Sequence, residues 1–315
     1  MLITKKKTIL KNQEISAKKR SKKKFWKTDN FIGYLFMIPT IIGFSIFVVY
    51  PLIFSAKYAL MEWDGLTTPI FVGLDNFKYL LTKDPVFIKT LVATFKYVLL
   101  TVPANLIFGL LLAVLLNKKL KGIKVFRTIY YLPVVLPSVA SLILWKFIYA
   151  SDYGLLNQIL NSMGLKPVEW LTSSKMAMVS IAITVIWGVG SQMIIFLSGL
   201  QSVPAEVYEA SNIDGCGRIR QFFSMTLPLI TPVLFLQLIT GIINSFQAYN
   251  QIAILTKGGP EYSTNVLGYS IVQSAFVDND YGYALAQVWI LIAIIMVFTI
   301  IIYQVSYKKV YYEAD

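Results

Sequence analysis

The sequence predicts an all-α polytopic membrane protein with six transmembrane helices. Apolar residues make up 56% of the 315 positions and charged residues only 14%, which is too few charges for an ordinary soluble protein. Six almost uncharged runs are long enough to cross a bilayer, because a spanning helix needs about 20 residues. Within a membrane domain at 29–310, these runs lie at about 31–55, 94–116, 128–149, 176–200, 227–250 and 284–307.

The distribution of the net charge of +13 predicts the orientation, because Lys and Arg collect in cytoplasmic loops. Residues 1–28 form a basic tail, the loop after the second span is basic, and the loop after the fourth span adds two arginines. The alternate loops carry most of the carboxylates. We therefore expect a multi-pass protein of the cell membrane with both termini in the cytoplasm and a tail that contacts anionic lipid. Beyond the tail, the basic positions in the segments predicted to be cytoplasmic are Lys118, Lys119, Lys121, Lys124, Arg127, Arg218, Arg220, Lys308 and Lys309.

Several function classes are excluded by residue types that the chain lacks. It has no histidine, which excludes His-based metal sites and Ser-His-Asp catalysis. It has no P-loop pattern, so we expect no ATP bound by this chain, and we predict neither a catalytic residue nor a metal or cofactor. The only cysteine is Cys216, so an intramolecular disulfide is impossible. No folded soluble segment accompanies the tail, so nucleic acid is not an expected partner.

The first and third spans contain prolines and glycines that membrane helices tolerate. Gly33, Pro39 and Gly43 lie in the first span. The third span contains Pro133 and Pro137, which should bend the helix and free backbone carbonyls that can face a cavity. A structural kink without any ligand contact is the alternative for this span.

The fourth and fifth spans each carry small and polar residues on one helical face, since their spacing is three or four. On the fourth span these residues are Thr184, Trp187, Gly188 and Ser191. On the fifth span they are Gln237, Gly241, Asn244, Ser245 and Ala248. Amides, hydroxyls and an aromatic ring without charges suit an uncharged solute such as a sugar. Helix–helix packing is the alternative role for these residues.

The loop at 203–228 is a polar interruption between these two spans. Pro204 suits the first turn of a helix, with Ser202 as its N-cap. Asp214-Gly215 predicts a turn, because glycine tolerates positive φ. A second short helix should run from 217 to 225 and stop before Pro228. Two short helices held between membrane spans would form a projection that another protein could bind.

This loop resembles the EAA loop of the membrane subunits of ATP-binding-cassette importers. Ser211 occupies the place of the usual second alanine, and Met225 that of an isoleucine. Residues 73–77, 132–138 and 255–260 resemble the G-L-x-N-F, L-P-x-x-x-P-S and L-T-x-G-G-P segments of the carbohydrate branch. The residues of the predicted coupling loop are Glu209, Ala210, Ser211, Asp214, Gly215, Leu227 and Pro228.

The resemblance implies a type I importer permease that forms half of a carbohydrate pathway, with an oligosaccharide as the expected solute. It implies a homologous second permease in a heterodimer, two ATPase subunits that bind ATP and Mg, and an extracytoplasmic solute-binding protein. The alternatives are an importer of this superfamily for another solute such as amino acids, or a secondary transporter, which the lack of mid-span charges disfavours. By analogy with maltose-type permeases, the predicted pathway comprises Ser138, Thr184, Trp187, Gly188, Gly241, Ser245 and Ala248, with Asn244 and Gln247 beside them.

Overall fold

The computed structural model describes residues 29–118 and 121–307. The predicted basic tail at 1–28 lies outside the described residues, as do Lys119, Lys308 and Lys309. The chain divides into two compact units, residues 1–57 and residues 58–315. Within the described ranges both units are almost entirely helical, and the only strands are two short ones in the second unit.

The first unit contains one helical run that covers the span expected at 31–55. Its segments are α2 (Asp29–Phe44), the π-helical turn η2 (Ser45–Val49) and α3 (Tyr50–Tyr58). The stretch Gly33–Tyr58 is long and apolar enough to cross a membrane. Pro39 lies inside α2 without ending it.

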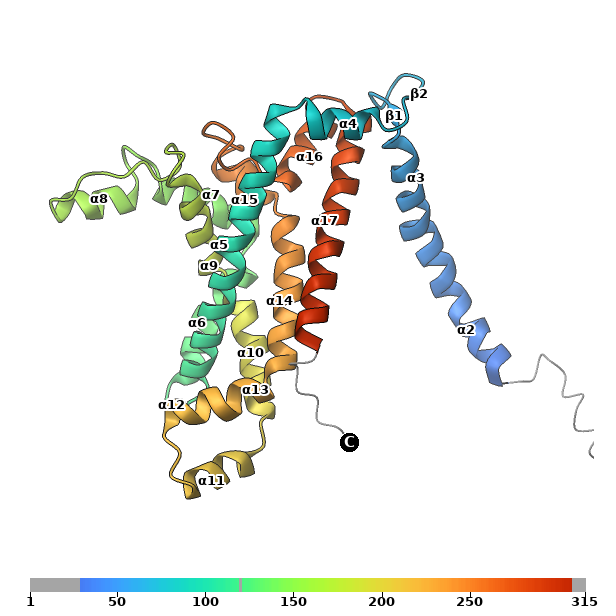
Figure 1. Cartoon of the computed structure of the whole chain (residues 1–315). Helices are drawn as coiled ribbons and strands as arrows, with labels where there is room; N and C mark the ends of the chain where they lie inside the picture. Colours follow the sequence, from blue (N-terminus) through green and yellow to red (C-terminus); the bar gives the residue numbers. More distant parts are fainter. Residues whose placement is uncertain (1–28, 119–120, 308–315) are drawn as a thin grey trace, which may run out of the picture. The chain divides into compact units, whose positions relative to one another are not determined.

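The second unit holds the remaining helices and a two-stranded hairpin (Figure 1). In chain order these elements are β1 (Met61–Glu62), β2 (Ile70–Phe71), α4 (Asp75–Thr82), α5 (Pro85–Leu116), α6 (Ile123–Val135), α7 (Ser138–Ile148), α8 (Leu155–Ser162), α9 (Ala177–Trp187), α10 (Gly190–Ser202), α11 (Ala205–Ile213), α12 (Arg218–Gln221), η3 (Phe222–Thr226), α13 (Leu227–Leu229), α14 (Thr231–Phe246), α15 (Asn250–Leu255), α16 (Leu267–Phe276) and α17 (Tyr281–Tyr307).

Two spans of this unit are single helices. α5 begins at Pro85, ahead of the predicted start at 94, because the Asp84 carboxylate accepts a hydrogen bond from the Val86 N–H at 2.8 Å and caps the helix. Pro103 lies inside α5 without interrupting it. α17 covers the span expected at 284–307. Both helices are long and apolar enough to cross a membrane.

The other three predicted spans, at 128–149, 176–200 and 227–250, are bent pairs of helices. The bend expected from the prolines of the third span is confirmed, whereas the breaks in the fourth and fifth spans were not predicted. α6 and α7 meet at 98°, α9 and α10 at 49°, and the helix Arg218–Leu229 meets α14 at 68°. The described chain thus has three helices able to span a membrane, or up to six spans if each bent pair counts as one. The fifth span also ends early, at Phe246, so Gln247 and Ala248 lie beyond α14.

The sharpest break has a local cause in the sequence. Leu136 precedes Pro137 and has an extended backbone with ψ of 144°, because the proline ring disfavours helical conformation in the preceding residue. Pro133, the other proline predicted to bend this span, lies inside α6. The break therefore occurs at Leu136, the residue before Pro137, where the helical backbone conformation is interrupted.

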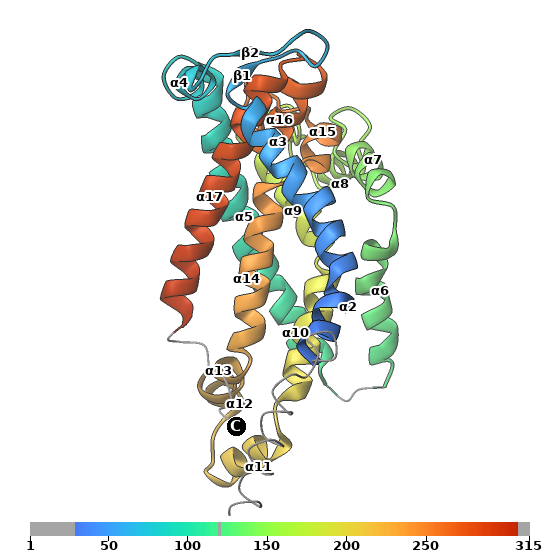
Figure 2. The same ribbon diagram turned by 90° about the vertical axis from the view of Figure 1, so that its right-hand side faces the viewer.

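α5 forms the centre of the second unit. It packs against α9, α10, α14 and α16, and Figures 1 and 2 show these helices around it. Buried aromatic residues fill the contacts, such as Phe87 and Phe246 in one cluster and Phe196 in another. Gly109 allows α10 to approach closely, because a Cβ atom there would lie 3.1 Å from Gln192.

The hairpin and α4 lie at the end of this unit opposite α11 (Figures 1 and 2). Asn76 donates its side-chain N–H groups to the carbonyls of Ala59 and Met61 at 3.0 and 2.9 Å. Gly282 allows the Met61 carbonyl oxygen to pack against the start of α17. Any side chain there would clash, since a Cβ atom would lie 2.0 Å from that oxygen. Asn76 of the predicted G-L-x-N-F segment therefore attaches α4 to the hairpin. Hydrogen bonds from Thr67 and Leu66 also lower the pKa of Asp64 in the hairpin loop to about 2.

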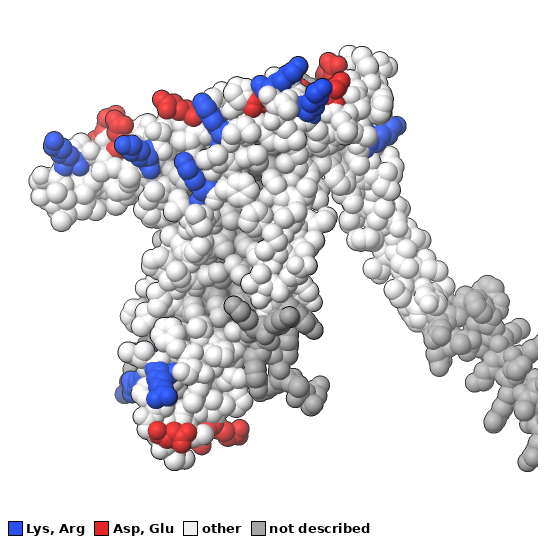
Figure 3. All heavy atoms as spheres, viewed as in Figure 1, with Lys and Arg blue, Asp and Glu red and all other residues white. Residues whose placement is uncertain are grey.

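Charged side chains of the second unit gather at its two ends and leave an uncharged belt between them (Figure 3). The loops opposite α11 were expected to be acidic. Figure 3 shows lysine or arginine beside carboxylates there, so this end is mixed in charge. The uncharged belt is the feature that a bilayer requires.

Candidate functional site

A cavity of about 300 Å³ lies at the breaks of two spans. It is bounded by the end of α6, the start of α7, and both sides of the gap between α9 and α10. α5 and α15 close it with one residue each. The lining residues are Asn105, Pro133, Val134, Leu136, Ser138, Ser141, Leu142, Trp145, Thr184, Val185, Trp187, Gly188, Ser191, Gln192 and Gln251. None of these side chains is ionisable, so the cavity offers amides, hydroxyls and indole rings to a solute.

Four predicted pathway residues meet in this cavity: Ser138, Thr184, Trp187 and Gly188. The helix break between Gly188 and Gly190 does not separate them, and Ser191 beyond it also lines the cavity. The shared face expected on the fourth span therefore exists in the folded chain.

The five predicted pathway residues on the fifth span do not line this cavity. Ser245 bonds to the Thr101 hydroxyl at 3.2 Å, and Gly241 faces Val102, so both lie at the contact between α14 and α5. Ala248 is buried in a hydrophobic cluster. Asn244 and Gln247 are exposed.

The cavity also uses polar residues that the sequence did not identify as a site. Asn105 and Ser141 line it, and neither the Asn105 Oδ1 nor the Ser141 Oγ has a hydrogen-bond partner within the described chain. Ser141 is 9% exposed. Buried polar atoms normally have partners, so these two oxygens are available to a polar molecule in the cavity. Asn105 and Gln251 come from helices far apart in sequence, and only the fold brings them together.

Two indole rings form the aromatic part of the lining. Trp145 and Trp187 lie edge to face, with ring centroids 5.8 Å apart and planes at 73°. Trp145 also packs on Tyr149, whose hydroxyl donates to the Ser180 carbonyl at 2.8 Å. This anchoring fixes Trp145, so the two rings form a rigid wall.

The predicted coupling loop contains a helix closed by a glycine turn. The Gly215 N–H donates to the Asn212 carbonyl at 3.1 Å and the Cys216 N–H to the Ser211 carbonyl at 2.9 Å. With φ of 70° at Gly215, these bonds form a Schellman motif, in which glycine is favoured because it has no Cβ. The predicted turn is thus confirmed.

Two details of this loop were predicted wrongly. Ser202 does not cap α11, since its hydroxyl donates to the Gly199 carbonyl and α11 begins after Pro204. The second helix does not stop before Pro228 but continues to Leu229. Pro228 lies within α13, which follows the π-helical turn η3 without a break.

The coupling loop presents an exposed surface at the end of the second unit (Figure 1). Glu209 and Ala210 are exposed. Three apolar side chains are also largely exposed: Ile213 at 86%, Ile219 at 77% and Phe223 at 62%. Exposed apolar groups beside charged ones are typical of a protein–protein contact.

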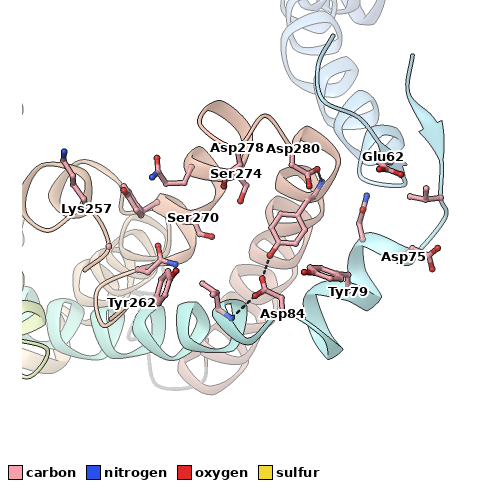
Figure 4. Close-up of a pocket in the computed structure, with 18 residues that line it drawn as sticks. Glu62, Asp75, Tyr79, Asp84, Lys257, Tyr262, Ser270, Ser274, Asp278 and Asp280 are labelled. Carbon is pink, nitrogen blue, oxygen red and sulfur yellow. Dashed lines mark hydrogen bonds between the residues drawn. The ribbon is translucent and has the colours of Figure 1, made fainter. Parts of the chain in front are cut away.

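A larger cavity of about 780 Å³ lies at the opposite end, between α4, α16 and the starts of α5 and α17 (Figure 4). Carboxylates line it, including Asp75, Asp278 and Asp280. Asp84 accepts a hydrogen bond from the Tyr283 hydroxyl. Among the described residues, no three acidic or cysteine side chains are grouped as a metal site.

A family model described as "Binding-protein-dependent transport system inner membrane component" matches residues 105–310, well over half of the chain. The protein belongs to this family. It is therefore a multi-pass membrane component of a binding-protein-dependent transport system.

Similar proteins include sugar permeases. A probable ABC transporter permease protein, YesP of Bacillus subtilis, is 37% identical over 91% of this chain and 94% of its own length. The multiple sugar-binding transport system permease protein MsmF of Streptococcus mutans is 34% identical over 89% of this chain and 97% of its own.

A solved structure shows the same fold. It is a bacterial alginate ABC transporter in complex with an alginate pentasaccharide-bound periplasmic protein, and one chain matches with a TM-score of 0.79 and 23% identity over 90% of this chain and 97% of its own. The type I ABC importer permease fold implied by the sequence is thereby confirmed.

Proposed function

We propose that this chain is one permease subunit of an ATP-driven importer and forms half of a pathway for a carbohydrate. The observation that carries the proposal is the uncharged cavity at the breaks of α6–α7 and α9–α10. Amides and hydroxyls can donate to and accept from sugar hydroxyls, and indole rings can pack against the apolar face of a sugar ring.

The relatives support a carbohydrate over other solutes. MsmF is named for multiple sugars, and the structurally similar transporter was solved with a protein that holds an alginate pentasaccharide. An amino acid would require charged or strongly polar groups for its ammonium and carboxylate. The cavity lining contains no ionisable side chain, which disfavours that alternative.

The second permease subunit would contribute the other half of the pathway. Asn244 and Gln247 do not line the cavity of this chain but are exposed, so they remain available to a partner subunit. An extracytoplasmic solute-binding protein would deliver the sugar to the end of the molecule opposite α11. The chain would lie in a bacterial cell membrane with both termini in the cytoplasm.

ATP hydrolysis would take place on two separate ATPase subunits, which would hold ATP and Mg. The exposed face of the coupling loop, with Glu209, Ala210 and Ile213, would bind the ATPase. Closure of the ATPase dimer would then displace α11 and the spans attached to it, as in rigid-body alternating access.

The test is a pull-down of this chain in mild detergent with mass spectrometry of the co-purifying chains. We expect a second permease with an EAA-like loop, an ATPase and a solute-binding protein that retains a sugar. Recovery of the chain alone, or as a homodimer without an ATPase, would refute the proposal.

Gly215 provides a second test of the coupling role. Gly215→Val forces a β-branched residue to φ of 70°, which costs about 1–2 kcal/mol or more and opens the Schellman turn. We expect loss of ATP-driven import with normal membrane insertion. Gly215→Asn is the control, because nothing lies within 4 Å of a Cβ at this position and Asn tolerates left-handed backbone. Normal import by Gly215→Val would argue against the coupling role.

A further inference from the structure

A partly buried network of polar side chains joins the two helices of the coupling loop. Tyr208 and Ser211 belong to α11, whereas Gln221 and Thr226 belong to the helix Arg218–Leu229. The Gln221 side-chain N–H donates to the Ser211 Oγ and more weakly, at 3.4 Å, to the Tyr208 carbonyl. The Tyr208 and Thr226 hydroxyls bond at 3.2 Å. Ser211 and Thr226 are buried, at 1% and 4% exposure, whereas Tyr208 and Gln221 are partly exposed.

The network does not cap either of the two helices. The Schellman bonds at Gly215 end α11 on their own, and α12 starts at Arg218 without a side-chain cap. Between the two helices the chain contains Gly215 and Gly217, and a Cβ atom at either glycine would meet nothing within 4 Å. No side-chain packing restrains the chain at these two glycines, so the bonds from Gln221 to Ser211 and between Tyr208 and Thr226 link the two helices directly.

We propose that Ser211 and Gln221 are positioning residues that lock α11 to the helix Arg218–Leu229. With the lock closed, a displacement of α11 passes to the fifth span instead of being absorbed at the glycine connection. This inference rests on the proposed function, since it assigns a partner-driven movement to α11.

The joint beyond the lock keeps backbone hydrogen bonds on both sides of its bend. The helix Arg218–Leu229 meets α14 at Ile230, which is 1% exposed. The Ile230 N–H donates to the Thr226 carbonyl at 3.1 Å, and its own carbonyl accepts from Leu234 at 3.0 Å. Backbone hydrogen bonds thus continue on both sides of the 68° bend. With the lock closed, α11, the helix Arg218–Leu229 and α14 would move together.

The identity of residue 211 suits this role. Ser211 occupies the place where the EAA-type pattern usually has alanine, and alanine could not accept the Gln221 hydrogen bond. Removing either side chain deletes the bond that joins the two helices at this point, although the Ser211 hydroxyl keeps its bond to the Tyr208 carbonyl within α11 at 3.0 Å. The two residues therefore act as a pair.

The test measures the distance between α11 and α14 in the complete importer recovered by pull-down and placed in lipid nanodiscs. In a Cys216→Ser background, spin labels are attached at Glu206→Cys on α11 and at Leu236→Cys on α14, both exposed positions. The distance is recorded without nucleotide and after trapping with ATP and vanadate.

We expect the distance in the otherwise unmodified chain to be the same in both states. In Ser211→Ala and in Gln221→Ala it should shift on trapping, and the double variant should shift no further because the same bond is lost. Ser224→Ala is the control, since Ser224 is an exposed residue of η3 outside the network. A purely structural role would lower the melting temperature without making the distance depend on nucleotide.

Two results would contradict the proposal that Ser211 and Gln221 lock the two helices together. One is an unchanged distance on trapping in both single variants, and the other is a shift in the unmodified chain as large as in the variants. If no ATPase co-purifies, the proposed function and the lock fail together. If an ATPase is present and the distances contradict the expectation, only the lock fails.

Discussion

The helix α5 and the pair α6–α7 show how proline has opposite outcomes in two parts of this molecule. Pro103 lies inside α5, which continues for 32 residues and packs against neighbouring helices that include α9, α10 and α14. Leu136-Pro137 ends α6 and turns the chain by 98°. The continuous helix forms the packed scaffold, whereas the broken pair borders the cavity. Interruption of the helix, and not polarity alone, distinguishes the candidate pathway from the scaffold.

The largest effect is expected where the broken spans touch. Gly190 begins α10 against α6, and a Cβ there would lie 2.3 Å from the Tyr130 carbonyl oxygen. Gly190→Val should therefore destabilise the fold by more than about 3 kcal/mol. Melting in detergent, followed by fluorescence-detected size exclusion, would measure the loss. Gly188→Ala is the control, since its Cβ would meet only the Val185 carbonyl at 3.4 Å.

Pro137→Ala should reduce import more than it reduces stability. Without the ring, Leu136 can become helical, which would straighten the break and deform the cavity. We expect import of the sugar retained by the co-purified binding protein to fall by about tenfold, equivalent to about 1.4 kcal/mol. Pro103→Ala should leave import nearly unchanged, because it adds a backbone bond to an unbroken helix. Equal import by the two variants would remove the distinction between scaffold and pathway.

Trp187→Ala should raise the KM for sugar import by several-fold, because one wall of the cavity is lost. Assembly with the partner chains should be retained, since Trp187 is 39% exposed and lies away from the coupling loop. Import kinetics and pull-down recovery would be measured on the same preparation. Unchanged kinetics would assign Trp187 to packing with Trp145.

The smallest effects are expected from replacing two serines, Ser141 in the cavity and Ser245 in the scaffold. Ser141→Ala should raise the KM and leave melting unchanged, because its Oγ has no partner within the described chain. Ser245→Ala should instead destabilise the fold by about 1 kcal/mol, since it removes the bond to Thr101, and the KM should not change. A raised KM in Ser245→Ala, with an unchanged KM in Ser141→Ala, would instead place Ser245 in the pathway.

Much of the architecture could be predicted from the sequence because apolar length and charge placement dictate it. Thr184, Trp187 and Gly188 could be assigned to one face because helical spacing fixes neighbours within a span. The same reasoning failed for Gly241 and Ser245, since spacing does not reveal whether a face meets a cavity or another helix. Asn105 and Gln251 could not be found, because their proximity depends on how distant helices fold together.

The most direct measurement is the reactivity of cysteines placed in the cavity and in the scaffold. In a Cys216→Ser background, Ser141→Cys and Ser245→Cys would be exposed to a charged, membrane-impermeant thiol reagent in the assembled importer, with and without ATP and vanadate. The account predicts that Ser141→Cys reacts at a rate that changes with nucleotide state, while Ser245→Cys stays protected in both states. Protection of Ser141→Cys in every state, or equal reaction at both positions, would contradict a pathway at the helix breaks.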